Sequence, residues 1–233
     1  MRILALETST EWCSVAVGDG THWQRRDERV GHAHSERLLP MVDAALVDAG
    51  WALRDLEGIA FGAGPGSFTG IRIGCGVAQG LAFAGNLPVV PIPTLAALAQ
   101  QVFRDQGWPC VVACLDARMH EVYVAAYARD AERWREVAAP AVVAPGELAL
   151  CLPNASGKWA GAGGGFAVYP ALASQLALTK VAPDAHPTAQ AIGELALAPL
   201  AAGEGVAAAD ALPIYVRHRV ALTTAEREAG LRL

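Results

Sequence analysis

The sequence predicts an α/β protein made of two related halves, each organised around a mixed β-sheet. The first observation is the order of patterns over residues 2–104, which runs strand, strand, strand, helix, strand, helix, strand, helix. The second is the composition, since 53% of the 233 residues are hydrophobic and 18% are charged, which suits a sizeable core and argues against disorder. The third is a weaker alternation of strands and helices after residue 107, which indicates a degenerate second copy of the first half.

The first three strands are expected to pair as a meander. Residues 2–6 are a nearly continuous apolar run, as in a buried strand, and residues 12–17 predict a second strand. Gly18-Asp19-Gly20 predicts a hairpin turn, because Asp-Gly accommodates positive φ at little cost. The third strand, over residues 21–29, has a polar and exposed character.

Helical crossovers to further strands follow the meander. Strands are predicted at 58–63 and 89–92. The helices are predicted over 35–49, closed by Gly50, then over 71–84 and 94–104.

Gly107-Trp108-Pro109 interrupts the pattern and predicts the boundary between two lobes. We expect an N-terminal lobe over 1–106, a degenerate C-terminal lobe over 107–212, and a tail over 213–233 that packs back on the first lobe. Within the second lobe and the tail, the expected elements are strands at 110–115 and 121–128, a weaker strand at 134–138, helices near 171–176 and 188–202, and a strand-like or linking stretch at 213–222.

Charge and cysteine content limit the classes of function. The formal net charge of −5 disfavours a protein that grips RNA or DNA on its own. Five cysteines with no Cys-x-x-Cys pair indicate reduced thiols in a cytosolic protein rather than a zinc or redox site. Residues 73–92 carry no charge, but two prolines and an asparagine late in this stretch argue against a membrane helix. No signal peptide is expected either, so the expected location is cytoplasmic.

Two loops could carry chemistry. The turn after the first strand presents Glu7, Thr8 and Ser9, which could hold a phosphate or a metal-bound water, or could be an ordinary hairpin. The second loop could bind an anion at the start of a helix, or could be a backbone turn that requires its glycines. It matches neither a Walker A loop nor Gly-x-Gly-x-x-Gly. Its residues are Gly64, Pro65, Gly66, Ser67, Phe68, Thr69 and Gly70.

The helix over 71–84 has little side-chain bulk, which predicts close approach of another backbone. The helix over 35–49 could be its mate, and it is apolar around more than one face, as in a helix that is buried or that meets a partner. Which face points outward is left open, because each helix must also cover its own sheet. The residues predicted to form a partner interface are Leu38, Leu39, Val42, Ala45, Leu46, Gly74, Cys75, Ala78 and Leu81.

No pattern of catalytic side chains stands out. The six histidines include no His-x-x-x-His and no His-Glu-x-x-His, and the sequence has no Gly-x-Ser-x-Gly. We therefore predict no catalytic residue, no metal site and no cofactor.

Four segments together resemble the TsaB (YeaZ) family. They are the run over 3–10, the run over 34–40, the loop and helix start over 64–74, and Asp116-Ala117-Arg118-Met119-His120-Glu121-Val122-Tyr123. The likeness reappears at 213–217. It implies an actin-like ATPase fold (ASKHA, ribonuclease H-like) with two related lobes. It also implies a role in making threonylcarbamoyladenosine in tRNAs that read codons beginning with A.

The resemblance implies partners as well. A TsaB protein binds and activates TsaD, which transfers the threonylcarbamoyl group, while the ATPase TsaE is the third member. We expect contact with tRNA only through that complex, and self-dimerisation through the same helices when TsaD is absent.

The departures from TsaD imply a non-catalytic role. Thr94 and Leu98 stand where TsaD carries its metal-binding histidines, and neither can replace an imidazole. Asp116-Ala117-Arg118 replaces a Ser-Gly-Gly turn at which phosphate can approach the backbone. Glu7 stands where many members of the family have Asp. The alternative is an enzyme, either a glycoprotease-like peptidase or a kinase of the actin-like fold.

Overall fold

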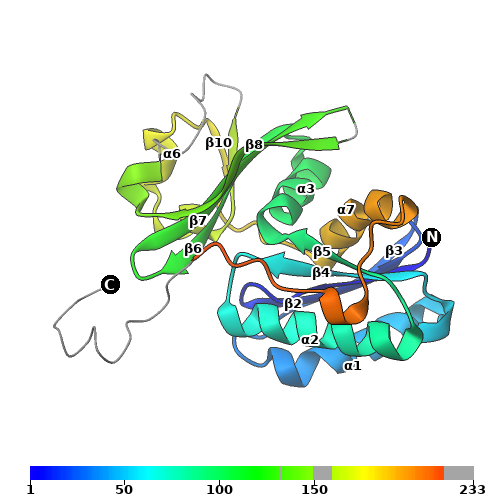
Figure 1. Cartoon of the computed structure of the whole chain (residues 1–233). Coiled ribbons are helices and arrows are strands. Elements are labelled where there is room, and N and C mark those ends of the chain that lie inside the picture. Colours follow the sequence, from blue (N-terminus) through cyan, green and yellow to red (C-terminus); the bar gives the residue numbers. More distant parts are fainter. Residues whose placement is uncertain (132, 149–158, 218–233) are drawn as a thin grey trace, which may run out of the picture.

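The computed structural model describes residues 1–131, 133–148 and 159–217, and it contains two five-stranded sheets (Figure 1). The first sheet has the order β3-β2-β1-β4-β5, and the second, taken from its other edge, has the order β8-β7-β6-β9-β10. The strands of the first sheet are β1 (Ile3–Glu7), β2 (Trp12–Gly18), β3 (Trp23–Arg29), β4 (Gly58–Gly64) and β5 (Val89–Pro93). Those of the second are β6 (Cys110–Arg118), β7 (Glu121–Asp130), β8 (Arg133–Val143), β9 (Ala160–Ala162) and β10 (Lys180–Ala182).

The two sheets have the same topology. In each, the first strand of the half lies at the centre, pairs antiparallel with the second strand and pairs parallel with the fourth. The remaining pairs also correspond, since β2–β3 and β7–β8 are antiparallel while β4–β5 and β9–β10 are parallel. The prediction of two related halves with mixed sheets is therefore confirmed.

Helices cover the first sheet on both faces (Figure 1). On one face lie α1 (His34–Ala49) and α2 (Phe68–Gly85), whose apolar side chains share one core with β1, β2 and β4. The helices α3 (Thr94–Gln106) and α7 (Ala189–Ala201) lie between the two sheets. α3 shares its core with β6 and β7, whereas α7 packs its apolar side on β1, β2, β4 and β5. The helix at the end of each half thus packs on the sheet of the other half.

The far side of the second sheet is covered by two short helices, α5 (Gly164–Val168) and α6 (Ala171–Gln175). Phe166 and Leu172 of these helices pack against Val112 and Cys114 of β6. Single 3₁₀ turns complete the connections at η1 (Leu53–Asp55), η2 (Pro145–Glu147) and η3 (Ala208–Asp210).

Most elements of the first half lie within one or two residues of their predicted bounds. The larger difference is α2, which begins at Phe68 rather than at residue 71. The cause is Ser67, whose side chain accepts a hydrogen bond from the amide of Gly70 and so caps the helix. α1 ends as predicted at Gly50, whose φ of 69° is left-handed.

The second half differs more from the sequence-based expectation. β8 runs from residue 133 to 143, about twice the predicted length. β9 and β10 were not predicted, because three residues of small or ordinary type carry no periodicity. Residues 211–217 form no strand, and the rest of the stretch predicted at 213–222 lies outside the described residues.

Residues 211–217, named here the C-terminal strap, contact both halves of the molecule. The amide of Ile214 donates to the carbonyl of Ala63 at the end of β4, over 2.8 Å. Arg217 donates to the carbonyl of Ala117 in β6, over 3.1 Å, and pairs with Glu121 of β7. The strap therefore bridges the two sheets on the side where α2 begins (Figure 1).

Within the described residues, no helix is long and apolar enough to cross a membrane. Four of the cysteines, Cys13, Cys75, Cys110 and Cys114, are free thiols, and Cys151 lies outside the described residues.

Candidate functional site

The turn between β1 and β2 is buried and locked to the glycine-rich loop. Glu7, Thr8 and Ser9 are each at most 2% exposed. The hydroxyl of Thr8 donates to the carbonyl of Gly70 over 2.8 Å. The amide of Ser67 donates to the carbonyl of Ser9 over 2.7 Å. The two predicted loops are therefore one packed unit.

Glycine is required along this contact because the two backbones touch. A Cβ at Gly66 would lie within 3.0 Å of the Ser9 carbonyl oxygen, and a Cβ at Gly70 within 3.0 Å of that of Thr8. Gly74 meets the Thr8 hydroxyl in the same way. These distances favour the interpretation of the loop as a backbone turn that needs its glycines. The phosphate-binding role of the turn stays a prediction.

Glu7 is the one titratable side chain in this unit. Burial raises its pKa to about 6, and the hydrogen bond from the amide of Ser9 opposes the shift only in part. The amide of Ser9 donates to Oε1 over 2.5 Å, whereas Oε2 and the hydroxyl of Ser9 have no hydrogen-bond partner in the described structure. Glu7 is the residue here that could hold a cation or a proton. No three His, Cys, Asp or Glu side chains gather at a metal-binding distance in the described ranges.

The positions compared with TsaD have structural contacts here. The hydroxyl of Thr94, fully buried at the start of α3, accepts the amide of Gly64 over 3.2 Å. Leu98 is fully buried in the core that α3 shares with the second sheet. Asp116 lies at the end of β6, where its carboxylate accepts the amide of Arg118 over 3.1 Å.

The structure places most of the residues predicted to face a partner inside the chain. Leu39 is 47% exposed and Leu81 is half-buried. The other seven are buried within the chain itself, where they cannot meet a partner while the helices keep these positions; they are Leu38, Val42, Ala45, Leu46, Gly74, Cys75 and Ala78. The reason is the one left open by the sequence, since both helices turn their bulkier apolar stripe toward β1, β2 and β4.

A different set of residues forms the outer face of α1 and α2. Its exposed apolar members are Leu39 and Val47 of α1 with Phe68 and Phe83 of α2, and Phe83 is 83% exposed. Glycines make the middle of α2 flat, because a Cβ at Gly76 or Gly80 would meet nothing within 4 Å. A shallow cavity of about 390 Å³ adjoins Phe83, between the end of α2 and residues 205–209. We call the exposed surface of α1 and α2 that contains Leu39, Val47, Phe68, Gly76, Gly80 and Phe83 the outer face below.

Arg72 is a further residue of this face that sequence reasoning missed. Its guanidinium carbon lies 3.9 Å from the ring centre of Phe68. Its Nε donates to the hydroxyl of Tyr215 in the C-terminal strap, over 2.9 Å. Since 143 residues separate these partners in sequence, no local pattern could have shown the contact.

Comparison with known proteins places the chain in a family. A model of the TsaD family, described as tRNA N6-adenosine threonylcarbamoyltransferase, matches residues 28–223. The tRNA threonylcarbamoyladenosine biosynthesis protein TsaB of Escherichia coli is 40% identical over 225 residues, which cover 95% of this chain and 96% of that protein. TsaB of Haemophilus influenzae is 39% identical over 232 residues, covering 94% and 95%.

A solved structure agrees with these relatives. YeaZ from Pseudomonas aeruginosa has 40% sequence identity and a TM-score of 0.84, with 92% of this chain and 99% of that one covered. Together with the two sheets of equal topology, this match confirms the actin-like ATPase (ribonuclease H-like) fold. By its sequence and by its structure, the chain belongs to the TsaB (YeaZ) family.

Proposed function

We propose that this chain is a non-catalytic subunit for the formation of threonylcarbamoyladenosine in tRNAs that read codons beginning with A. In this role it binds and activates TsaD, which transfers the threonylcarbamoyl group, and it meets TsaE within the ternary complex. tRNA is bound only through that complex, in the cytoplasm. The two full-length relatives named as biosynthesis proteins of this nucleoside support the pathway.

One observation carries the non-catalytic role. Thr94 and Leu98, which stand where TsaD has metal-binding histidines, are both fully buried, one bonded to Gly64 and one packed in the core. Neither side chain supplies a metal ligand of the kind that iron or zinc requires. The alternative enzymes, a peptidase or a kinase, would need a nucleophile or a phosphate cradle. The packed turn at Glu7 and the glycine-rich loop favour neither.

The outer face of α1 and α2 is the surface proposed for TsaD. Isolated exposed hydrophobics are common, but here Leu39, Val47, Phe68 and Phe83 gather on two neighbouring helices. TsaD is a relative of the same fold, so its matching helix pair can complete a four-helix arrangement. Without TsaD, a second copy of the chain would cover the same face, and the homodimer would compete with the complex.

Reconstitution tests the function. Purified TsaD, TsaE, tRNA and threonylcarbamoyl-adenylate are incubated with and without this chain, and modified adenosine is measured by mass spectrometry. We expect product above background only when the chain is present. Equal product without it would contradict the activating role. Stoichiometric binding of Mg-ATP, iron or zinc by the isolated chain would favour the enzyme alternatives.

A matched pair of substitutions tests the surface. Gly80→Trp places a large ring on the open middle of α2, whereas Gly80→Ala adds only a Cβ to the same position. We expect the tryptophan to weaken TsaD binding by about one to two orders of magnitude, as overpacking does, and the alanine to change it little. Calorimetry measures affinity, and circular dichroism checks that both variants fold. Full affinity in both variants would place the interface elsewhere.

A further inference from the structure

Arg72 is held in a fixed orientation at the start of the outer face. It lies in the second turn of α2 and is exposed to solvent. Its guanidinium group lies over the Phe68 ring, and its Nε donates a hydrogen bond to the Tyr215 hydroxyl. The two aromatic rings also contact each other, with centroids 5.8 Å apart. A long side chain that usually samples many rotamers is thus already ordered before any ligand arrives.

The two terminal nitrogens of this guanidinium can donate hydrogen bonds to an anionic ligand. Among the described residues, neither Nη of Arg72 has a hydrogen-bond acceptor or a carboxylate within salt-bridge distance. Two exposed arginines of β3 and α1 are different, because Arg26 pairs with Asp48 and Arg37 pairs with Glu28. The first turn of α2 also contains no acidic residue, so the positive end of the helix dipole adds to the charge of Arg72.

The surroundings favour a protein carboxylate over a nucleic-acid phosphate. Phe68 next to Arg72 is 46% exposed, and exposed apolar area beside an ordered arginine is typical of a protein interface. An RNA site would need several free cations, because neutralising phosphates drives that affinity. The net charge of −5 and the paired arginines on β3 and α1 argue against such a site.

We infer that Arg72, preorganised by Phe68 and Tyr215, is the charged anchor of the outer face and donates hydrogen bonds to a carboxylate of Asp or Glu of the docking protein. The inference rests on the proposed function, since it names the contact through which TsaD is held. It also gives the C-terminal strap a part in binding, because Tyr215 belongs to the strap. A planar carboxylate can accept hydrogen bonds from both terminal nitrogens at once, and a lysine cannot make such a bidentate pair.

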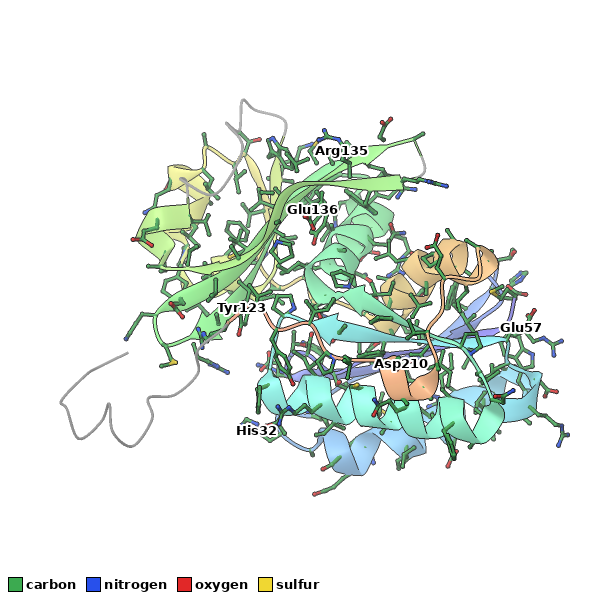
Figure 2. The ribbon with its side chains drawn as sticks, in the orientation of Figure 1. His32, Glu57, Tyr123, Arg135, Glu136 and Asp210 are labelled. Atoms are coloured by element: carbon green, nitrogen blue, oxygen red, sulfur yellow. The ribbon has the colours of Figure 1, made fainter. Side chains whose placement is uncertain are left out.

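Affinity for purified TsaD tests the inference in four variants. We expect Arg72→Ala to weaken binding at least about thirtyfold, as for an interface hot spot. Arg72→Lys should restore little of this loss, because charge alone does not replace the bidentate geometry. Tyr215→Phe removes only the hydroxyl that holds Nε and should weaken binding by a smaller factor, about threefold to tenfold. The control is Arg135→Ala, an exposed arginine on β8 far from α2 in Figure 2, which should leave affinity unchanged.

The outcomes separate the two proposals. Wild-type chain that fails to bind TsaD contradicts the proposed function. Wild-type binding with equal affinity for Arg72→Ala and Arg135→Ala overturns only the carboxylate anchor. Unchanged TsaD affinity combined with weaker tRNA binding by the Arg72→Ala complex would assign Arg72 to a phosphate and also overturn it. Substitution of surface Asp and Glu residues of TsaD one at a time then identifies the carboxylate that pairs with Arg72. Substitution of that residue should weaken binding to the wild-type chain but not to the Arg72→Ala variant.

Discussion

Glu7 is the most heavily buried acid in the described structure, and its cost to stability depends on pH. Its side chain is 1% exposed, one oxygen has a single backbone donor, and the other has no partner among the described residues. Burial therefore raises its pKa from 4.5 to about 6. Since the folded chain holds this proton more tightly than the unfolded chain, the stability linked to Glu7 is fully present below about pH 4.5. It is lost as the pH rises through 6, by about 2 kcal/mol in all.

Glu7→Gln should remove this dependence. The amide is neutral at every pH, and its oxygen can still accept the amide of Ser9. We expect the unfolding free energy of the variant, relative to wild type, to rise by about 2 kcal/mol between pH 4.5 and pH 7.5. Urea unfolding at the two pH values measures it. Glu36→Gln, at an exposed glutamate of α1, is the control. A difference that stays constant with pH would contradict the buried acid as its cause.

Two glycines of α2, six residues apart, should respond to alanine with opposite signs. A Cβ at Gly74 would collide with the Thr8 hydroxyl, which bonds Gly70, whereas a Cβ at Gly80 would enter open space. We expect Gly74→Ala to destabilise the fold by about 1–3 kcal/mol. Gly80→Ala should stabilise it by up to about 1 kcal/mol through helix propensity. Thermal melting followed by circular dichroism measures both, and equal effects would show that Thr8 does not set the sign.

At the scale of elements, the C-terminal strap holds a strained hairpin. Arg118, Met119 and His120, at the tip between β6 and β7, all have left-handed φ values, of 60°, 53° and 58°. Such residues cost about 1 kcal/mol or more each when they are not glycine. Arg217 of the strap bonds both sides of the tip, at the Ala117 carbonyl and at Glu121. Its side chain is only 13% exposed, so these bonds are sheltered from water.

Arg217→Ala should loosen this tip locally. Loss of two bonds from a charged donor is expected to speed amide exchange at residues 116–121 about tenfold, while α1 keeps its protection. Hydrogen–deuterium exchange with mass spectrometry reads both segments in one experiment. Arg118→Ala is the comparison, since the side chain of Arg118 is 86% exposed and its ion pair among the described residues is with Asp116 in the same hairpin. Unchanged exchange at the tip would mean that the hairpin keeps its conformation without the strap.

Local sequence patterns predicted the elements whose conformation depends on residues close by in the sequence. The meander and its turn at Gly18 followed from apolar runs and Asp-Gly chemistry, and Gly50 ended α1 as predicted. Strands of three residues, β9 and β10, depend on their neighbours for hydrogen bonds and left no signal. The loop at 64–70 was visible as a special segment. Its contact with Thr8 and Ser9 was not, because close backbone approach is a tertiary property.

The outward faces of α1 and α2 were likewise beyond the sequence. Both helices have apolar residues on two sides, and periodicity cannot say which side meets the sheet. In the structure Leu38 and Ala78 are buried against the sheet side, whereas Phe83 and Arg72 are exposed on the outer side. The hydroxyl that accepts a hydrogen bond from Arg72 belongs to Tyr215, 143 positions away, so only the fold reveals that part of the candidate site.

At the scale of the whole molecule, the two halves exchange their last helices. α3 follows the first sheet in sequence but supplies Leu95, Leu98 and Val102 to the core of the second. α7 follows the second sheet but covers Ile3, Ala5 and Ala60 of the first. Polar bonds reinforce the exchange, since Gln100 and Arg104 of α3 both bond Glu194 of α7. Neither sheet is covered on both faces by its own half of the chain.

The exchange predicts that the two halves fold as one unit. A chain cut after residue 106 keeps the first sheet with α1 and α2 but leaves the face under α7 open to water. We therefore expect fragment 1–106 to lose near-ultraviolet circular dichroism and to bind a hydrophobic dye, and addition of fragment 107–233 to restore the native spectrum.

For the intact chain, urea unfolding followed by far-ultraviolet dichroism and by tryptophan fluorescence should give coincident transitions. The tryptophans Trp12 and Trp23 report on the first sheet, while Trp134 lies on the second. Two separated transitions, or a stable and monomeric 1–106 fragment, would show that each lobe is an independent domain and that the exchanged helices add little to either.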